Sequence, residues 1–176
     1  MSTALKTSML PRRVDPRKLA NQGVALKGEI MPNQCLRLAD AVLEILEPIT
    51  ASLSFDINDR GHRSVSGSAV TSVNIDCHRC LEPMQLPLKA ELDVEIVWSE
   101  DSARNVPRDC DPWVVETESA DIIALVEEEL LLALPIVNYH PEEECTSTVG
   151  YSTGEELAAE KSDRSNPFEI LGQLKG

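Results

Sequence analysis

Two pairs of residues carry side chains that can bind a metal ion or exchange electrons. Cys77 and Cys80 form a CxxC motif, and His140 and Cys145 form a second pair farther along the chain. Cysteine and histidine ligands in two close pairs are typical of a structural zinc site. The long interval between the pairs differs from that of a zinc finger. Three interpretations therefore stay open at this point: bound zinc, two reduced cysteines that pack as structure, and a thiol-redox pair.

The redox interpretation depends on where the CxxC motif lies. A thioredoxin-like motif opens a helix, where the helix dipole lowers the pKa of the thiol. Here the motif lies between runs of alternating apolar residues, which predict strands on both sides. The sequence also contains no glycine-rich phosphate loop and no HExxH motif. We therefore expect a protein that is not an enzyme, with no catalytic residues and no cofactor beyond a structural zinc ion.

The other two cysteines are expected to be inert. Cys35 lies among apolar neighbours, where a free cysteine usually acts as a small buried hydrophobe. Cys110 lies between Asp109 and Asp111, whose carboxylates should raise the pKa of its thiol and make it less reactive.

The residues after the CxxC motif predict a long amphipathic strand. From Met84 to Trp98 every second residue is apolar, a period that only a strand with one buried face requires. Two further alternating runs, 50–58 and 65–75, flank a turn sequence that ends in Gly61 and predict a hairpin. Together the three runs predict an antiparallel meander or partly closed barrel.

One main helix is predicted over 121–133, with Ser119 as its cap and Pro135 just beyond its end. Its apolar residues cover a wide arc, so we expect the helix to pack on the apolar face of the sheet. Glu129 falls inside this arc and needs a partner if it is buried; we predict an ion pair with Arg79.

The expected fold class is α+β, an antiparallel β-sheet packed against one main helix, with a short C-terminal helix. Composition divides the chain into four expected segments. These are a basic flexible arm (1–20), an α+β core domain (21–141), an acidic, polar and disordered segment (142–165) and a short docking helix (166–176).

The charge of the chain points to basic partners. The net charge is −14 and the pI about 4.6. Affinity for nucleic acid depends on lysine and arginine side chains that displace counterions, so an acidic chain is poorly suited to phosphate contacts. Acidic surfaces speed encounters with basic proteins, although the charge could also serve only to keep the protein in solution. The basic residues nearest the N-terminus are the ones that could touch RNA: Lys6, Arg12, Arg13, Arg17, Lys18 and Lys27.

The sequence predicts a cytoplasmic protein. No apolar run approaches the roughly 20 residues of a membrane span. The N-terminus lacks the apolar core of a secretory signal, so the five cysteines are expected to be reduced thiols or metal ligands.

Several motifs occur in a fixed order along the chain. They are Cys77-His78-Arg79-Cys80-Leu81, the run 121–135 that ends in Leu-Pro, the pair His140 and Cys145, and Asn166-Pro167-Phe168. This set resembles the YceD family, also known as DUF177, whose bacterial members are named large ribosomal RNA subunit accumulation proteins.

The resemblance implies a cytoplasmic, non-catalytic role in ribosome biogenesis, in the synthesis, processing or stability of large-subunit (23S) ribosomal RNA. Some family members carry two cysteine pairs, and this chain has His140 and Cys145 in place of the second pair. Combined with the charge, the resemblance predicts action through a basic ribosomal protein or assembly factor, with rRNA touched only by the N-terminal arm.

Overall fold

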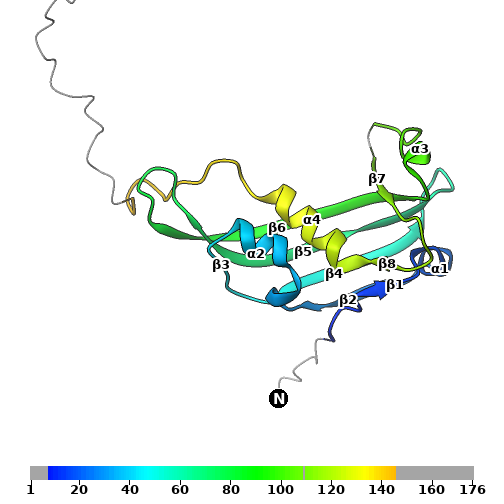
Figure 1. Ribbon diagram of the computed structural model, residues 1–176, viewed down its shortest axis with the longest axis horizontal. Coiled ribbons are helices and arrows are strands. Elements are labelled where there is room, and N and C mark those ends of the chain that lie inside the picture. Colours follow the sequence, from blue (N-terminus) through cyan, green and yellow to red (C-terminus); the bar gives the residue numbers. More distant parts are fainter. Residues whose placement is uncertain (1–7, 109, 146–176) are drawn as a thin grey trace, which may run out of the picture. The chain divides into compact units, whose positions relative to one another are not determined.

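The computed structural model describes residues 8–108 and 110–145. Within these residues the chain forms the expected α+β fold, a long twisted sheet with few helices (Figure 1). The short helix predicted over 166–176, and nearly all of the segment predicted to be disordered over 142–165, lie outside the described residues.

The main sheet contains the strands in the order β2-β4-β5-β6-β7, and the short β3 pairs with β5 beyond the end of β4. The bounds are β2 Ala25–Ile30, β3 Glu44–Ile45, β4 Ile49–Ile57, β5 Arg63–Asp76, β6 Pro83–Val97 and β7 Asp111–Val114. The predicted meander is confirmed, because β4, β5 and β6 pair antiparallel in sequence order.

The prediction of a wholly antiparallel sheet is wrong at one edge. Strand β7 pairs parallel with β6, so the sheet is mixed. A parallel neighbour needs a crossover connection of about a dozen residues. The segment 98–110 supplies this connection and contains the short helix α3 (Glu100–Ala103). Local periodicity could not show the pairing, because it reports which face of a strand is buried and not which strand lies beside it.

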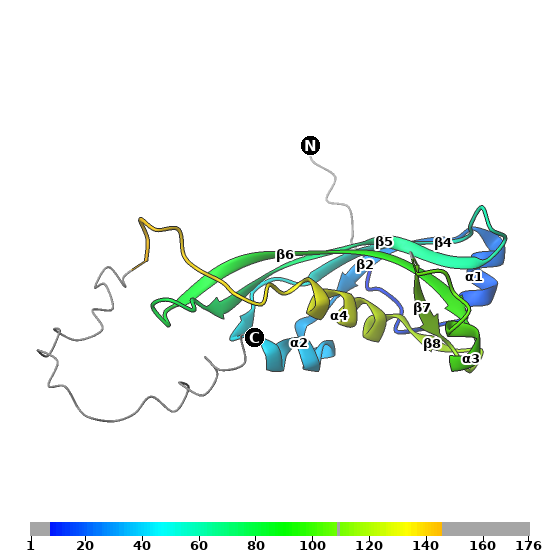
Figure 2. The same cartoon turned by 90° about the horizontal axis from the view of Figure 1, so that it is seen from above.

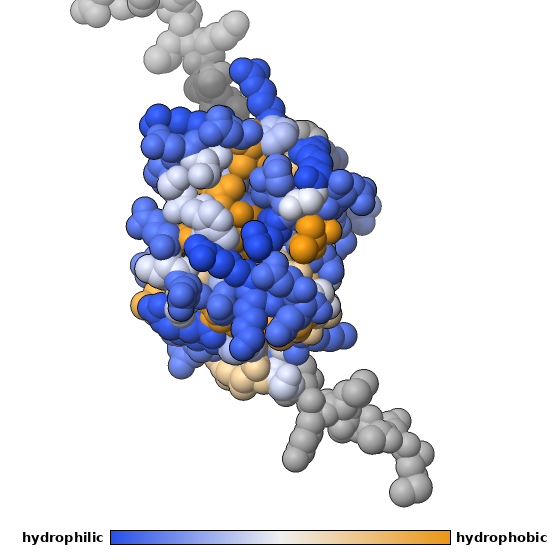
Figure 3. Space-filling model, turned by 90° about the vertical axis from the view of Figure 1, so that its right-hand side faces the viewer, coloured by the Kyte–Doolittle hydropathy of each residue, from blue (hydrophilic) through white to orange (hydrophobic). Residues whose placement is uncertain are grey.

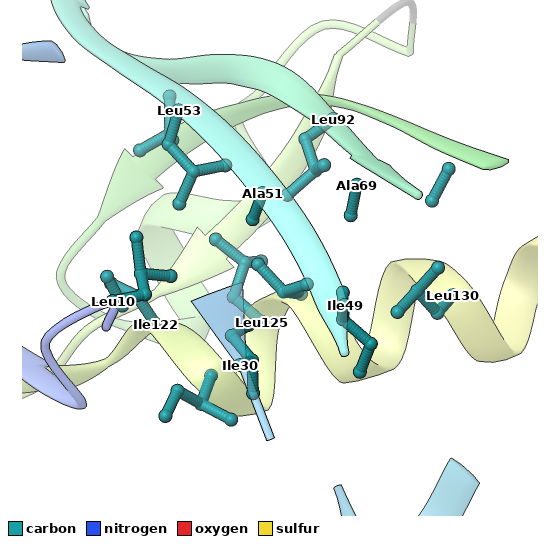
Figure 4. Close-up of a cluster of buried hydrophobic side chains, with 14 of the residues drawn as sticks. Leu10, Ile30, Ile49, Ala51, Leu53, Ala69, Leu92, Ile122, Leu125 and Leu130 are labelled. Atoms are coloured by element: carbon teal, nitrogen blue, oxygen red, sulfur yellow. The ribbon is translucent and has the colours of Figure 1, made fainter. Parts of the chain in front are cut away.

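The core lies between one face of the sheet and helix α4 (Ile122–Ala133). Figure 2 shows α4 and the short α2 (Leu36–Ala41) on the same face of the sheet, and Figure 4 shows the apolar side chains that meet there. Ala51, Ala69 and Ala90 pair across the three central strands. These small side chains belong to the buried core, and burial of each larger apolar side chain around them contributes about 1.5–3 kcal/mol.

The described part of residues 1–20 is folded, so the prediction of a flexible arm is wrong there. Strand β1 (Arg13–Val14) pairs with β8 (Ala120–Asp121), and helix α1 (Pro16–Gln22) follows it. Leu10 is buried, and its N–H donates to the carbonyl of Glu29 at 2.9 Å. Leu10 follows Met9 in a mostly polar and basic segment, and two adjacent apolar residues are a weak sequence signal. Its burial also depends on Gly28, where a Cβ would lie 2.5 Å from the carbonyl oxygen of Ser8.

Helix α4 begins later than predicted and has a different cap. Asp121, and not Ser119, occupies the N-cap position, and its carboxylate accepts hydrogen bonds from the N–H groups of Ile123 and Ala124 at 3.1 Å. The pairing of β8 with β1 keeps the chain extended up to Asp121, so the helix starts after that residue.

The buried carboxylate of α4 is Glu127, and the predicted pair of Glu129 with Arg79 is absent among the described residues. Glu127 accepts a hydrogen bond from the N–H of Leu38, at the start of α2. Glu129 is half-buried, and burial together with nearby acidic groups raises its pKa. Arg79 instead lies 5.1 Å from the ring centroid of Tyr139.

The surface at the end of the sheet that carries α1 and α3 is mostly hydrophilic, with small apolar patches between the polar side chains (Figure 3). At this end the guanidinium of Arg17 lies 3.4 Å from the ring centroid of Trp98. None of the helices in the described ranges is long and apolar enough to cross a membrane.

Candidate metal centre

The structure brings Cys77, Cys80, His140 and Cys145 together. Their ligand atoms all lie within 4.8 Å of one another. Around a zinc ion with Zn–S distances of about 2.3 Å, tetrahedral ligand atoms lie about 3.8 Å apart. A contraction of at most about 1 Å would therefore close the set around an ion. Three sulfurs and one imidazole nitrogen form a ligand set that could hold a metal ion.

Two elements position these ligands. Cys77 and Cys80 lie in the turn between β5 and β6, and His140 and Cys145 lie in the segment that follows α4. Figure 1 shows this segment running from the end of α4 to the tip of the β5–β6 hairpin. Because α4 lies along the sheet, its C-terminal end delivers the second pair to the same end of the sheet as the first.

Reciprocal hydrogen bonds join the two segments next to the ligands. The N–H of His78 donates to the carbonyl of Asn138 at 2.8 Å. The N–H of Asn138 donates in return to Nδ1 of His78 at 3.1 Å. His78 therefore holds the segment after α4 against the β5–β6 turn, beside the cluster. The sequence did not suggest this role, because it depends on contact with a residue 60 positions away.

The turn that carries the CxxC motif is tight. The N–H of Cys77 donates to the carbonyl of Glu82, and the N–H of Leu81 donates to the carbonyl of Cys77 at 2.8 Å. Leu81 has a φ of 60°, in the left-handed region that residues other than glycine rarely adopt. This turn brings both sulfurs into the cluster, and the Leu81 side chain is 77% exposed.

Backbone N–H groups favour the thiolate form of Cys77. Burial raises the pKa of Cys77, but hydrogen bonds from the backbone of Cys80, His140 and Arg79 outweigh it and lower the pKa to about 5. The N–H of His140 lies 3.4 Å from this sulfur. Burial also raises the pKa of Cys80, but hydrogen bonds outweigh it, chiefly the one with the backbone of Glu82, so the pKa of Cys80 is lowered as well. A thiolate in a buried site needs a nearby cation, which a metal ion would supply.

His140 is oriented as a metal ligand. Its Nδ1 lies 3.3 Å from the sulfur of Cys80, and its Nε2 lies 3.2 Å from the carbonyl oxygen of Pro83. If Nε2 carries the proton and donates to this carbonyl, Nδ1 is free to ligate. Metal-bound histidines commonly make such an outer hydrogen bond. The sulfur contacts of Cys77 and Cys80 raise the pKa of His140.

Cys35 and Cys110 lie outside the cluster. Burial, reinforced by Glu127, raises the pKa of Cys35 to about 12, and the residue lies in the apolar core. Cys110 lies within 3.4 Å of the guanidinium of Arg60. The cysteines of the described residues are all free thiols. Neither Cys77 nor Cys80 lies in a helix, so the arrangement lacks the helix N-terminus of a thioredoxin-like redox motif.

The fold and the site define an α+β domain with a three-cysteine, one-histidine cluster at one end of its sheet. The family model described as large ribosomal RNA subunit accumulation protein YceD matches residues 65–175. The large ribosomal RNA subunit accumulation protein YceD of Haemophilus influenzae is 33% identical over 167 residues, which cover 94% of this chain and 96% of that protein. No solved structure matches the chain. The chain therefore belongs to the YceD family.

Proposed function

We propose that this protein is a non-catalytic ribosome biogenesis factor that supports the accumulation of large-subunit (23S) ribosomal RNA by binding a basic ribosomal protein or assembly factor. The similarity to the Haemophilus influenzae protein, named for large ribosomal RNA subunit accumulation, carries this proposal, because it extends over 94% of the chain. Fold similarity alone would not support a function.

Charge supports action through a protein partner and not through RNA. The net charge is −14, which disfavours contacts with phosphate. Two of the basic residues near the N-terminus are also engaged within the fold. Arg12 donates to the carboxylate of Asp121 at 2.8 Å, and Arg17 stacks on Trp98. Among the described residues, fewer cations are thus left for RNA than the composition suggests.

Affinity capture of the full chain from cell lysate, with and without ribonuclease, tests the proposal. We expect ribosomal proteins or precursor particles to be recovered and to persist after ribonuclease treatment. The ratio of large-subunit to small-subunit rRNA should be lower in a deletion strain than in its parent. Recovery that disappears with ribonuclease would instead make RNA the direct ligand, and unchanged rRNA in the deletion strain would contradict the proposed function.

We further infer that the cluster binds a structural zinc ion. The observation that favours this second function is the convergence of four nitrogen and sulfur ligands, with the outer hydrogen bond of His140 already in place. Four protein ligands would fill a tetrahedral zinc, which suits a structural role and leaves no open position for substrate. The ion would join the β5–β6 turn to the segment after α4.

Elemental analysis of protein purified without chelators tests this inference. We expect about one zinc per chain, lost in Cys80→Ser and in Cys145→Ser. Cys110→Ser is the matched control, because this cysteine lies outside the cluster, and it should keep the metal. Metal-free protein in which the cluster thiols react as quickly as Cys110 would contradict the inference and favour the reactive-thiol alternative.

A further inference from the structure

A groove of about 460 Å³ lies beside the cluster, between α2 and the segment after α4. Its lining comes from the end of α2 and the turn from α2 to β3, from the end of β5, from His78, and from residues 134–136 and 138. Figure 1 shows these elements at the end of the sheet that also carries the β5–β6 turn.

The groove combines apolar and acidic side chains. Leu43 and Ile136 line it and are 53% and 94% exposed. Asp40 and Asp76 also line it, and neither makes an ion pair with another residue of the described ranges. Large apolar side chains exposed this far are common at surfaces that bind other proteins.

We propose that this groove binds a short basic, amphipathic segment of a partner protein. The inference deepens the proposed function, because it says which surface receives the basic partner and what chemistry that partner presents. Apolar side chains of the segment would cover Leu43 and Ile136, and its lysines or arginines would face Asp40 and Asp76. The same carboxylates would repel nucleic acid.

Fluorescence anisotropy with the full chain tests the proposal. The probe is a labelled peptide of leucine and lysine, about three helical turns long. Two further peptides replace the lysines by glutamate or the leucines by serine. We expect binding of the leucine–lysine peptide only. The double variants Asp40→Asn with Asp76→Asn, and Leu43→Ser with Ile136→Ser, should each weaken it about tenfold.

Matched controls separate the groove from the general charge of the protein. Asp93→Asn with Glu118→Gln removes two exposed carboxylates outside the groove, and Leu132→Ser removes a leucine that is 75% exposed on α4. Both should bind the peptide within about twofold of the natural chain. Equal weakening in groove and control variants would show attraction by net charge alone and overturn the proposal, as would groove variants that bind normally.

The outcome is independent of the rRNA measurement. Peptide binding at the groove together with unchanged rRNA in the deletion strain would refute the proposed function and keep the groove. The opposite outcome has three parts: large-subunit rRNA is lost in the deletion strain, both groove variants restore it, and the peptide does not bind. This outcome would refute the groove and keep the proposed function.

Discussion

The carboxylate of Glu127 joins two helices through the backbone of one of them. One of its oxygens accepts from the N–H of Leu38 at 3.1 Å, and the other lies 3.4 Å from the guanidinium of Arg37. The first N–H groups of a helix have no partner within that helix. Glu127 thus provides α2 with a cap that comes from α4, in a place where Cys35 at the N-cap provides none.

Removal of this carboxylate should destabilise the fold. Glu127→Ala leaves the N–H of Leu38 buried without an acceptor, so we expect a loss of about 2–3 kcal/mol in the free energy of unfolding, measured by urea titration. Glu128→Ala is the control, because its side chain is 63% exposed and its contact with Arg37 is 3.8 Å. It should change stability by under about 0.5 kcal/mol. Equal losses in the two variants would contradict the assigned role.

The sequence indicated that α4 carries a buried carboxylate that needs a partner, but it did not identify the correct carboxylate. A helical wheel places Glu129 inside the apolar arc and treats the sheet as the only surface that covers the helix. Helix α4 lies between the sheet and α2, so the buried sector extends to Glu127. This widening depends on where α2 packs, which local periodicity does not encode.

At the scale of elements, the start of α4 depends on Asp121. Burial raises the pKa of this carboxyl, but the N–H of Ala124, the N–H of Ile123 and the guanidinium of Arg12 outweigh it and hold the pKa below its usual value of 3.8. The charged form therefore stabilises the folded state at neutral pH. This stabilisation is complete above the unfolded pKa and is lost as the pH falls through the folded pKa.

Asp121→Ala should remove both the cap and its pH dependence. Near neutral pH we expect the free energy of unfolding to fall by about 1–2 kcal/mol. As the pH falls below about 4, the variant should lose less additional stability than the natural chain does. Unfolding by urea at a series of pH values measures both effects. Asp121→Asn keeps a capping oxygen and should lose less at neutral pH. A variant with the same acid sensitivity as the natural chain would show that other carboxyl groups dominate.

The elements differ in how far the sequence predicts them. The β4–β5–β6 meander follows from alternation and turn residues, since neighbouring strands connected by tight turns have little choice of partner. The pairs β6–β7 and β1–β8 join segments whose partners are chosen by tertiary packing, so they were not predicted. Likewise, residue types singled out the four cluster residues, whereas their proximity depends on the path of the chain after α4.

At the scale of the whole domain, a metal ion in the cluster would fix the segment 135–145 to the end of the sheet. Few regular elements hold this segment, so its order depends on the cluster and on the His78–Asn138 hydrogen bonds. Metal ligation that exists only in the folded state adds directly to stability.

Chelation of the metal, or Cys145→Ser, should therefore loosen this segment more than the core. We expect the melting temperature to fall by about 5–10 °C. Hydrogen exchange should increase in 135–145 and in the β5–β6 turn, with little change in β4 or the centre of α4. Cys110→Ser again serves as the control. Uniform loss of protection across the sheet would show that the cluster supports the entire fold.

The long reach of the N-terminal pairing sets an order of events during synthesis. Arg12 bonds to Asp121, 109 residues later, and β1 has no partner until β8 has emerged. At about 5–20 residues per second, translation of this interval takes about 5–20 s. Throughout that time the first strand of the nascent chain stays without its partner, while the β5–β6 hairpin, whose strands adjoin in sequence, can already form. Strand β1 is thus among the last elements to pair, although it is among the first to be made.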